Sequence, residues 1–206
     1  MRTNKIIEAI HEGQFDERLN EIYADPYIIS YEKNRYIQAL YQYNATFGAD
    51  EVEIFSAPGR SEIGGNHTDH QHGEVLAASI NRDAIAIVKK INRPQVTILS
   101  DGYASEITVD IDDLDKRKSE EGTTAALIRG VLAKIKTNGY SIGGFQAYIT
   151  SDVLIGAGLS SSAAFETLIG TIVSYLYNNH EISAVEIAKI GQYAENVYFG
   201  KPCGLM

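Results

Sequence analysis

Hydrophobic positions near the N-terminus follow a helical period. Between Tyr31 and Phe47, apolar side chains recur every three or four residues, as on the buried face of an amphipathic helix: Tyr36, Ile37, Leu40, Tyr41 and Tyr43. Gly48 follows this stretch directly and is a typical helix stop. The pattern predicts a helix over residues 31–47, within an N-terminal region that is helical and rich in Tyr.

After this region the pattern changes to short β-type segments. Residues 51–57 (EVEIFSA) alternate between polar and apolar as a half-buried strand does, and Pro58-Gly59 ends them. The polar, glycine- and histidine-containing stretch that follows predicts a loop over residues 59–73. Further strands are predicted at residues 75–80, 84–91, 95–99 and 107–111.

Helical patterns return in the second half of the chain. One apolar face runs through residues 123–138 with Gly139 directly after it, and residues 144–150 alternate as a strand does. A helix is predicted to begin in the Gly- and Ser-rich stretch 155–162, and another covers residues 184–198. These elements predict a single α+β domain.

Composition and charge exclude several classes of protein. The chain has 206 residues, of which 44% are hydrophobic and 22% charged, and a chain of this size buries a core without disulfides or metals. The single cysteine, Cys203, fits a reducing compartment. A net charge of −9 without long Lys/Arg runs argues against a nucleic-acid partner. Neither a signal peptide nor a membrane span is recognisable, so we expect a cytoplasmic protein with no membrane partner.

The strongest local signal is a Gly- and Ser-rich stretch that joins a predicted strand to a predicted helix: Gly156-Ala157-Gly158-Leu159-Ser160-Ser161-Ser162. Backbone N–H groups at a helix N-terminus lack internal partners, and glycines let an anion approach them closely, so the stretch suits a phosphate chain. The simpler interpretation is a tight turn with one Ser as N-cap, and the three serines after the glycines favour phosphate binding over it. No GxxxxGK[ST] or GxGxxG motif occurs.

A second polar segment, APGRSEIGGNHTDHQHG over residues 57–73, allows three interpretations. Arg60, Asn66, His67 and Asp69 offer a polyol several donors and acceptors. The His and Asp side chains of HTDHQH are also ordinary metal ligands, although their spacing matches no known site. A solvated loop whose side chains satisfy turn backbone is the third interpretation. Spacing alone leaves all three open.

Three segments together resemble one family. APGRSEIGGNHTDHQHGEVL resembles the galactokinase signature APGRxNxIGEHTDYxxGxVL, without insertion or deletion. VLIGAGLSSSAA resembles the GHMP kinase phosphate loop PxGxGLSSSA, and AENVYFGKPCGLM resembles the galactokinase segment AENxFxGxPCGIMDQ. The resemblance covers residues 31–206 and implies a GHMP-kinase-like N-terminal domain, a mixed β-sheet packed with helices. Residues 1–30 would form an N-terminal helical extension.

The resemblance also implies a function and a set of site residues. The family consists of ATP-dependent sugar kinases, here acting on the anomeric hydroxyl of galactose or a related hexose. The segment Gly156–Ser161 would cradle the ATP phosphates, and Ser162 with Glu195 would hold Mg²⁺. Arg60 would stand beside the transferred phosphoryl group and lower the pKa of the catalytic residue. The sugar would contact Asn66, His67, Asp69 and Gly204.

Several positions depart from the family pattern. Glu62 replaces an Asn and would place a carboxylate near Arg60, where it competes with phosphate. Asn66 replaces a Glu and changes the donors and acceptors offered to the sugar, so a related hexose or amino sugar also fits. Two further changes are His70 for the family's Tyr and Leu154 for its Pro.

The end of the chain is the largest departure. In the family, the Asp credited with activating the sugar hydroxyl follows the last motif, and a C-terminal half closes over the site; this sequence ends at Met206. We therefore expect a truncated N-terminal portion without the catalytic Asp, inactive alone, whose exposed apolar face favours self-association. Two alternatives are a non-catalytic sugar or nucleotide sensor derived from a galactokinase, and a metal-binding module on the His-rich loop.

Overall fold

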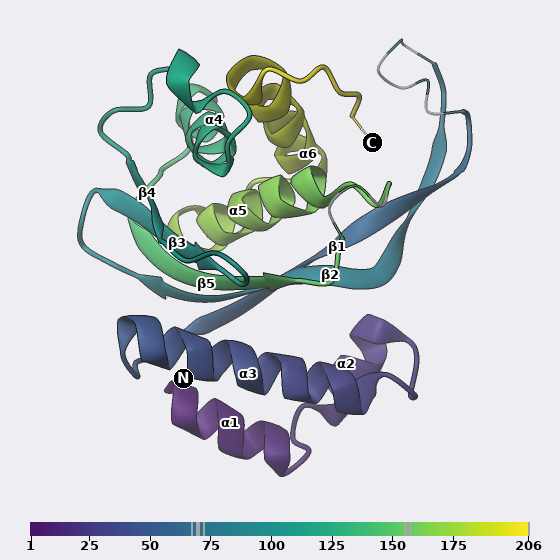
Figure 1. Cartoon of the computed structure of the whole chain (residues 1–206), viewed down its shortest axis with the longest axis vertical. Coiled ribbons are helices and arrows are strands. Elements are labelled where there is room, and N and C mark those ends of the chain that lie inside the picture. The colour runs from purple at the N-terminus through teal and green to yellow at the C-terminus, as the bar shows by residue number, and fades with distance from the viewer. Residues whose placement is uncertain (67, 69–70, 72, 155, 157, 206) are drawn as a thin grey trace.

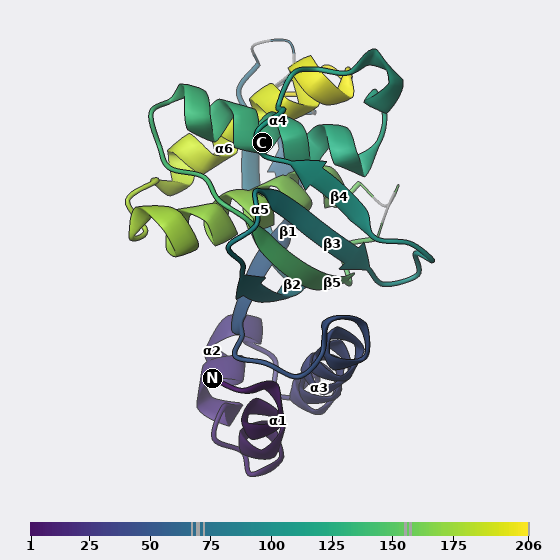
Figure 2. The same ribbon diagram turned by 90° about the vertical axis from the view of Figure 1, so that its left-hand side faces the viewer.

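A β-sheet lies between two layers of helices (Figure 1). The computed structural model describes residues 1–66, 68, 71, 73–154, 156 and 158–205. Three helices cover one face of the sheet: α1 (Thr3–His11), α2 (Asp16–Tyr23) and α3 (Ile29–Phe47). On the other face lie α4 (Thr124–Thr137), α5 (Ser161–Asn178) and α6 (Ala184–Tyr193), as the rotated view confirms (Figure 2). A 3-10 turn, η2 (Lys118–Glu120), precedes α4, and a π-helical turn, η3 (Ala194–Phe199), extends α6.

The sheet is mixed, as predicted. Its strands are β1 (Glu53–Gly64), β2 (Leu76–Lys90), β3 (Gln95–Ser100), β4 (Ile107–Asp110) and β5 (Phe145–Ser151), in the spatial order β1-β2-β5-β3-β4. The strands β3 and β5 run parallel, and the other neighbours are antiparallel. The sheet therefore delivers the end of β5 and the middle of β1 to the same edge of the molecule, where the candidate site lies.

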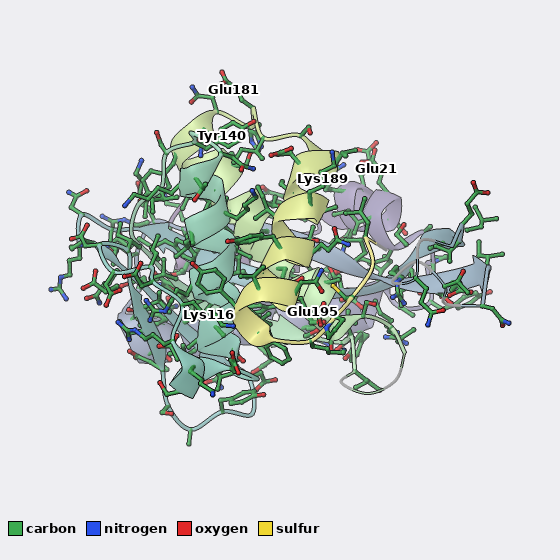
Figure 3. All side chains as sticks on the ribbon, turned by 90° about the horizontal axis from the view of Figure 1, so that it is seen from above. Glu21, Lys116, Tyr140, Glu181, Lys189 and Glu195 are labelled. Atoms are coloured by element: carbon green, nitrogen blue, oxygen red, sulfur yellow. The ribbon has the colours of Figure 1, made fainter. Side chains whose placement is uncertain are left out.

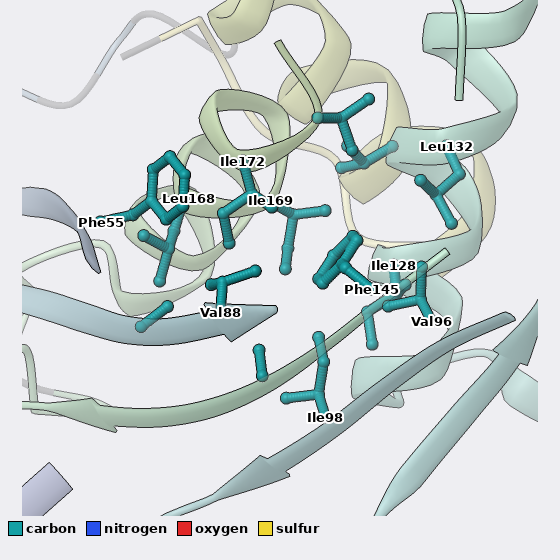
Figure 4. Packing of buried hydrophobic residues seen from close by; sticks show 14 of the residues in the cluster. Phe55, Val88, Val96, Ile98, Ile128, Leu132, Phe145, Leu168, Ile169 and Ile172 are labelled. Carbon is teal, nitrogen blue, oxygen red and sulfur yellow. The ribbon is translucent and has the colours of Figure 1, made fainter. Parts of the chain in front are cut away.

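Both faces of the sheet are buried, and the side chains of β2 alternate between two hydrophobic cores. Ala86 and Val88 face α4–α6, where they join the cluster shown in Figure 4, whereas Ile85 and Ile87 face α1–α3. A strand buried on both faces has no polar positions to alternate with, which explains the continuous apolar run AIAIV. The core beneath the sheet also contains Ile6, Ile7, Ile10, Leu19 and Tyr23 from the first two helices.

The predicted helices occur with shifts of a few residues at their ends. Gly48 ends α3 with a φ of 85°, and Gly139 follows α4 with a φ of 90°, both outside the helical region that L-residues favour. The predicted helix over 184–198 is α-helical only to Tyr193 and continues as the π-helical turn.

The predicted loop over residues 59–73 is wrong in its first part, and the predicted break between residues 80 and 84 does not exist. The strand β1 continues to Gly64 and β2 runs without interruption from Leu76, so the two form a long ribbon that projects beyond the sheet (Figure 1). Residues of this ribbon are largely exposed on both sides, so its cross-strand hydrogen bonds hold it together without the apolar alternation that marks a half-buried strand. The histidines of the predicted loop lie outside the described residues.

Candidate functional site

The segment between β5 and α5 turns through left-handed backbone conformations. Gly156 and Gly158 have φ values of 78° and 75°, and Ser160, the N-cap of α5, has a φ of 55°. In the described structure the Ser160 side chain does not cap the helix, and the first turn of α5 contains no acidic residue. The first N–H groups of α5 therefore stay available to an anion, at the positive end of the helix dipole.

Arg60 on β1 is hydrogen-bonded to this segment through both its backbone and its side chain. Its backbone N–H donates to the Leu159 carbonyl at 3.2 Å, and its guanidinium donates to the Gly158 carbonyl, also at 3.2 Å. The approach depends on Gly59, because a Cβ there would lie 2.9 Å from Cγ1 of Val153. The structure thus brings together two segments that lie about a hundred residues apart in the sequence, as the Arg60–Gly158 bond shows.

Ser162 and Glu195 face each other across the same cleft. The Ser162 hydroxyl donates to Oε1 of Glu195 at 3.0 Å, and the Lys201 ammonium lies 3.6 Å from the same oxygen. Glu195 belongs to the π-helical turn that follows α6 (Figure 3). A π-helical turn shifts the side-chain register of a helix and is common at functional sites. The turn packs tightly on α4, since a Cβ at Gly130 would lie 2.9 Å from Cα of Ala194.

Glu166 is a site residue that the sequence did not reveal. Its side chain is only 2% exposed, and its Oε1 has no hydrogen-bond partner in the described structure. Burial, and then the negative charge of Glu195, raise the pKa of Glu166 to about 9, so its carboxyl is neutral at pH 7. Its position four residues after Ser162, on the same helix face, was the available signal.

The thiol of Cys203 lies in the same region and stays protonated. Burial, followed by the charge of Glu195, raises the pKa of the Cys203 thiol to about 12. Its backbone N–H donates to Oδ1 of Asn196 at 2.6 Å, so this C-terminal segment is held against the π-helical turn. A protonated, backbone-anchored cysteine agrees with a packing role rather than a nucleophilic one.

Two adjoining cavities define the cleft. The first, of about 230 Å³, extends toward Glu166, and the second, of about 480 Å³, runs along the Gly/Ser segment. Both are lined by Arg60, Ser160, Glu195 and Gly204. A third cavity of about 580 Å³ opens beside Ser161 and Ser162, and its walls are mostly apolar, including Leu127, Ile149, Val153, Phe165 and Phe199.

The other predicted site residues are only partly placed. Asn66 is exposed at the far end of the β1–β2 ribbon with a φ of 62°, a conformation that Asn tolerates, and it lines neither cavity of the cleft. His67, Asp69 and Ala157 lie outside the described residues, as does most of the segment considered for a metal site. Within the part of the chain that is described, no three His, Cys, Asp or Glu side chains are grouped as metal ligands.

Comparison of the sequence with known proteins finds two matching family models and several related galactokinases. Residues 41–90 match the family model described as the galactokinase galactose-binding signature, and residues 126–206 match that of the GHMP kinases N-terminal domain. Galactokinase of Pyrococcus furiosus is 37% identical over 150 residues, covering 73% of this chain and 41% of the relative. Galactokinase of Clostridium tetani is 29% identical over 160 residues, covering 78% and 40% respectively.

Solved structures of related kinases have a similar fold. The structure of Lactococcus lactis galactokinase complexed with galactose superposes with a TM-score of 0.73 at 30% identity, over 80% of this chain and 43% of that chain. Mevalonate kinase of Methanococcus jannaschii shares the fold, with a TM-score of 0.61 at 19% identity. The match covers 74% of this chain and 48% of the mevalonate kinase chain. The chain spans about two-fifths of the length of the curated relatives it matches. Among the described residues, no helix is long and apolar enough to cross a membrane.

Proposed function

The chain belongs to the GHMP kinase family, and on that basis we propose that it provides the phosphate-binding and sugar-recognition part of a galactokinase-type phosphotransferase. The reaction transfers the γ-phosphoryl group of ATP to the anomeric hydroxyl of galactose or a related hexose, giving ADP, the sugar 1-phosphate and a proton. One observation carries the proposal: the uncapped N-terminus of α5, the Arg60 guanidinium and the Ser162–Glu195 pair converge on one cleft.

The Gly/Ser segment and Arg60 would bind the phosphates. Left-handed Gly156 and Gly158 keep the backbone free of side chains, and nothing lies within 4 Å of where their Cβ atoms would stand. Backbone N–H groups at a helix N-terminus or such a turn donate hydrogen bonds to phosphate oxygens. Arg60, held by the Gly158 carbonyl, would neutralise the transferred phosphoryl group, which is the main catalytic need of phosphoryl transfer.

The donor set also fits Mg²⁺. Ser162 Oγ and Glu195 Oε1 are hard oxygen ligands 3.0 Å apart, and Mg²⁺ in nucleotide sites is usually held by one or two protein oxygens together with phosphates and water. When bound, the ion would neutralise charge on the phosphates. Lys201 occupies the neighbourhood of Glu195 in the present structure and keeps that buried carboxylate paired.

The apolar cavity beside Ser161 and Ser162 would take the base of the nucleotide. Its volume of about 580 Å³ and its walls of aliphatic and phenyl side chains suit a flat aromatic group. Because it opens at the N-terminus of α5, a base bound there would direct its phosphates along the Gly/Ser segment. The apolar cavity thereby supports ATP rather than a free phosphate as the ligand.

Sugar recognition is proposed from the relatives and from the signature segment. Residues 41–90 match a galactose-binding signature, and the Lactococcus lactis relative was solved in complex with galactose. Asn66, at the end of the β1–β2 ribbon, would contact the sugar hydroxyls together with His67 and Asp69, and Gly204 would do so from the wall of the cleft. The departure at Asn66 leaves galactose and closely related hexoses as substrates to be compared.

The test is calorimetric titration with Mg²⁺·ATP, with and without the metal. We expect saturable binding that weakens when Mg²⁺ is removed and when Ser162 is replaced by Ala, while Ser141→Ala, the same change at an exposed position, has no effect. Absence of binding, or binding that ignores Mg²⁺, would contradict the proposal. Formation of hexose 1-phosphate by the full-length gene product, followed by ³¹P NMR, separates a kinase from a sensor that binds without transfer.

A further inference from the structure

A buried cluster of charged side chains joins the layer of helices α1–α3 to the sheet. The guanidinium of Arg35 on α3 lies 2.7 Å from Oε2 of Glu32, 2.6 Å from Oδ1 of Asp83 and 3.6 Å from Oδ2 of Asp152. It also donates to the Asp83 carbonyl at 2.9 Å. These four residues, here called the Arg35 cluster, come from α3, from β2 and from the residue that follows β5.

Burying the charged side chains of this cluster carries a large desolvation cost. Glu32 is fully buried and Arg35 is only 8% exposed. The Tyr23 hydroxyl donates a hydrogen bond to the Asp83 carboxylate at 3.0 Å. Well-packed hydrophobic residues of similar volume usually stabilise a protein at least as well as a buried ion pair. Directional contacts of this kind do, however, fix the relative positions of the elements that carry them.

The residue that follows β5, Asp152, lies just before the Gly/Ser segment, which is called the phosphate-binding segment below. The Asp152 N–H donates to the Asp83 carbonyl at 2.9 Å, and its carboxylate accepts the Tyr31 hydroxyl at 3.1 Å. The next residue, Val153, is buried and packs against Gly59 on β1. Asp152 therefore holds the start of the segment, whereas the Leu159 carbonyl, bonded to the Arg60 N–H, holds its end.

We propose that the Arg35 cluster positions the phosphate-binding segment, so that α3, which lines no part of the cleft, sets the nucleotide affinity through Asp152. The proposal rests on the proposed function for its ligand, but not for its geometry. Arg35 and Asp152 act here as positioning residues. We expect the second anchor, between Arg60 and Leu159, to respond to the first, because Val153 packs against Gly59, the residue before Arg60.

Two variants test the cluster without emptying the core. Arg35→Met would leave Glu32 and Asp83 buried without their cation and can prevent folding, so it is avoided. Asp152→Asn removes one charge at the rim of the cluster, and Tyr31→Phe removes one hydroxyl from a half-exposed side chain. The matched controls are Tyr41→Phe, an equally exposed tyrosine of the same helix, and Asp112→Asn, an exposed aspartate after β4.

Two measurements are made on each variant. The first is hydrogen exchange of the Arg60 amide in the ligand-free chain, which reports the far anchor of the segment and touches none of the substituted atoms. The second is the affinity for Mg²⁺·ADP by calorimetry. We expect Asp152→Asn to accelerate Arg60 exchange and weaken Mg²⁺·ADP binding by about tenfold each, with Tyr31→Phe smaller in the same direction and both controls unchanged.

The outcomes separate this inference from the proposed function. Unchanged Arg60 exchange in Asp152→Asn overturns the positioning role, whatever the nucleotide does. Faster exchange with unchanged Mg²⁺·ADP affinity also overturns it, because the anchor would then not act on the ligand. An unmodified chain that binds no Mg²⁺·ADP overturns the proposed function, and Arg60 exchange then still decides whether the cluster holds the segment.

Discussion

Replacing Glu166 by Gln gives the most direct test of the electrostatics of the cleft. The carboxyl is 2% exposed, its Oε1 lacks a partner in the described structure, and burial together with the charge of Glu195 raises its pKa from 4.5 to about 9. Gly191 closes the pocket around it, since a Cβ there would lie 3.0 Å from Oε2. Gln has nearly the same shape as protonated Glu, and it has no proton to lose.

The raised pKa means that the folded chain keeps a proton that the unfolded chain releases. The contribution of Glu166 to stability is therefore fully present below pH 4.5, declines as the pH rises toward about 9 and is constant above it. Each pH unit in this window lowers the free energy of unfolding by about 1.4 kcal/mol. Between pH 5.0 and 7.5 the loss is ~3 kcal/mol, which corresponds to roughly 10 °C in Tm for a chain of this length.

We expect Glu166→Gln to be close to the unmodified chain in stability at pH 5.0 and more stable by ~3 kcal/mol at pH 7.5. Urea unfolding of both proteins at half-unit pH steps measures the difference, in which the other titrating groups cancel. Glu181→Gln, the same change at an exposed position, is the control. A Glu166→Gln difference that stays constant with pH would refute the reasoning, because it would show that Glu166 ionises alike in the folded and unfolded chains.

Three further substitutions probe the supports of the site. Gly130→Ala places a Cβ 2.9 Å from Cα of Ala194, so urea unfolding is expected to show a loss of ~1–3 kcal/mol, and an unchanged midpoint would contradict the close packing of α4 on the π-helical turn. Ser162→Ala removes the hydroxyl bonded to Glu195; we expect a loss of Mg²⁺-dependent nucleotide binding in calorimetry with little change in Tm, and a large drop in Tm would instead indicate a structural role. Ser183→Ala removes the cap of α6, and thermal unfolding is expected to show a cost of ~1 kcal/mol, whereas no cost would mean that water replaces the cap.

Periodicity predicted the helices and central strands because each buries a regular face. Four of the five apolar positions singled out in residues 31–47 face the sheet as part of α3, and the fifth, Tyr41, is half-exposed. The run AIAIV is apolar throughout because β2 is covered on both sides. The β1–β2 ribbon was not predicted because the described residues of its outer part are largely exposed on both sides and therefore carry no periodic signal. Cross-strand hydrogen bonds between distant backbones are invisible in a local window.

The candidate site shows a similar division. Glycines, serines and Arg60 could be singled out because each residue type suits phosphate on its own. Glu166 could not, because a carboxylate in a helix reads as solvent-exposed until the neighbouring helix closes over it. The Arg35 cluster also escaped notice, since its members are spread over α3, β2 and the end of β5 and become neighbours only in the fold.

The neutral state of Glu166 resolves an apparent conflict between the acidic chain and an anionic ligand. The chain carries a net charge of −9, and two carboxyls line the first cavity of the cleft. Only Glu195 remains charged there, because Glu166 holds its proton up to about pH 9, and Glu195 is balanced by Lys201 at 3.6 Å. Arg60 and the N-terminus of α5 are the positive groups beside the Gly/Ser segment in the described structure. A phosphate bound as proposed would therefore meet positive groups on an acidic protein, and ionising Glu166 above pH 9 would weaken their field.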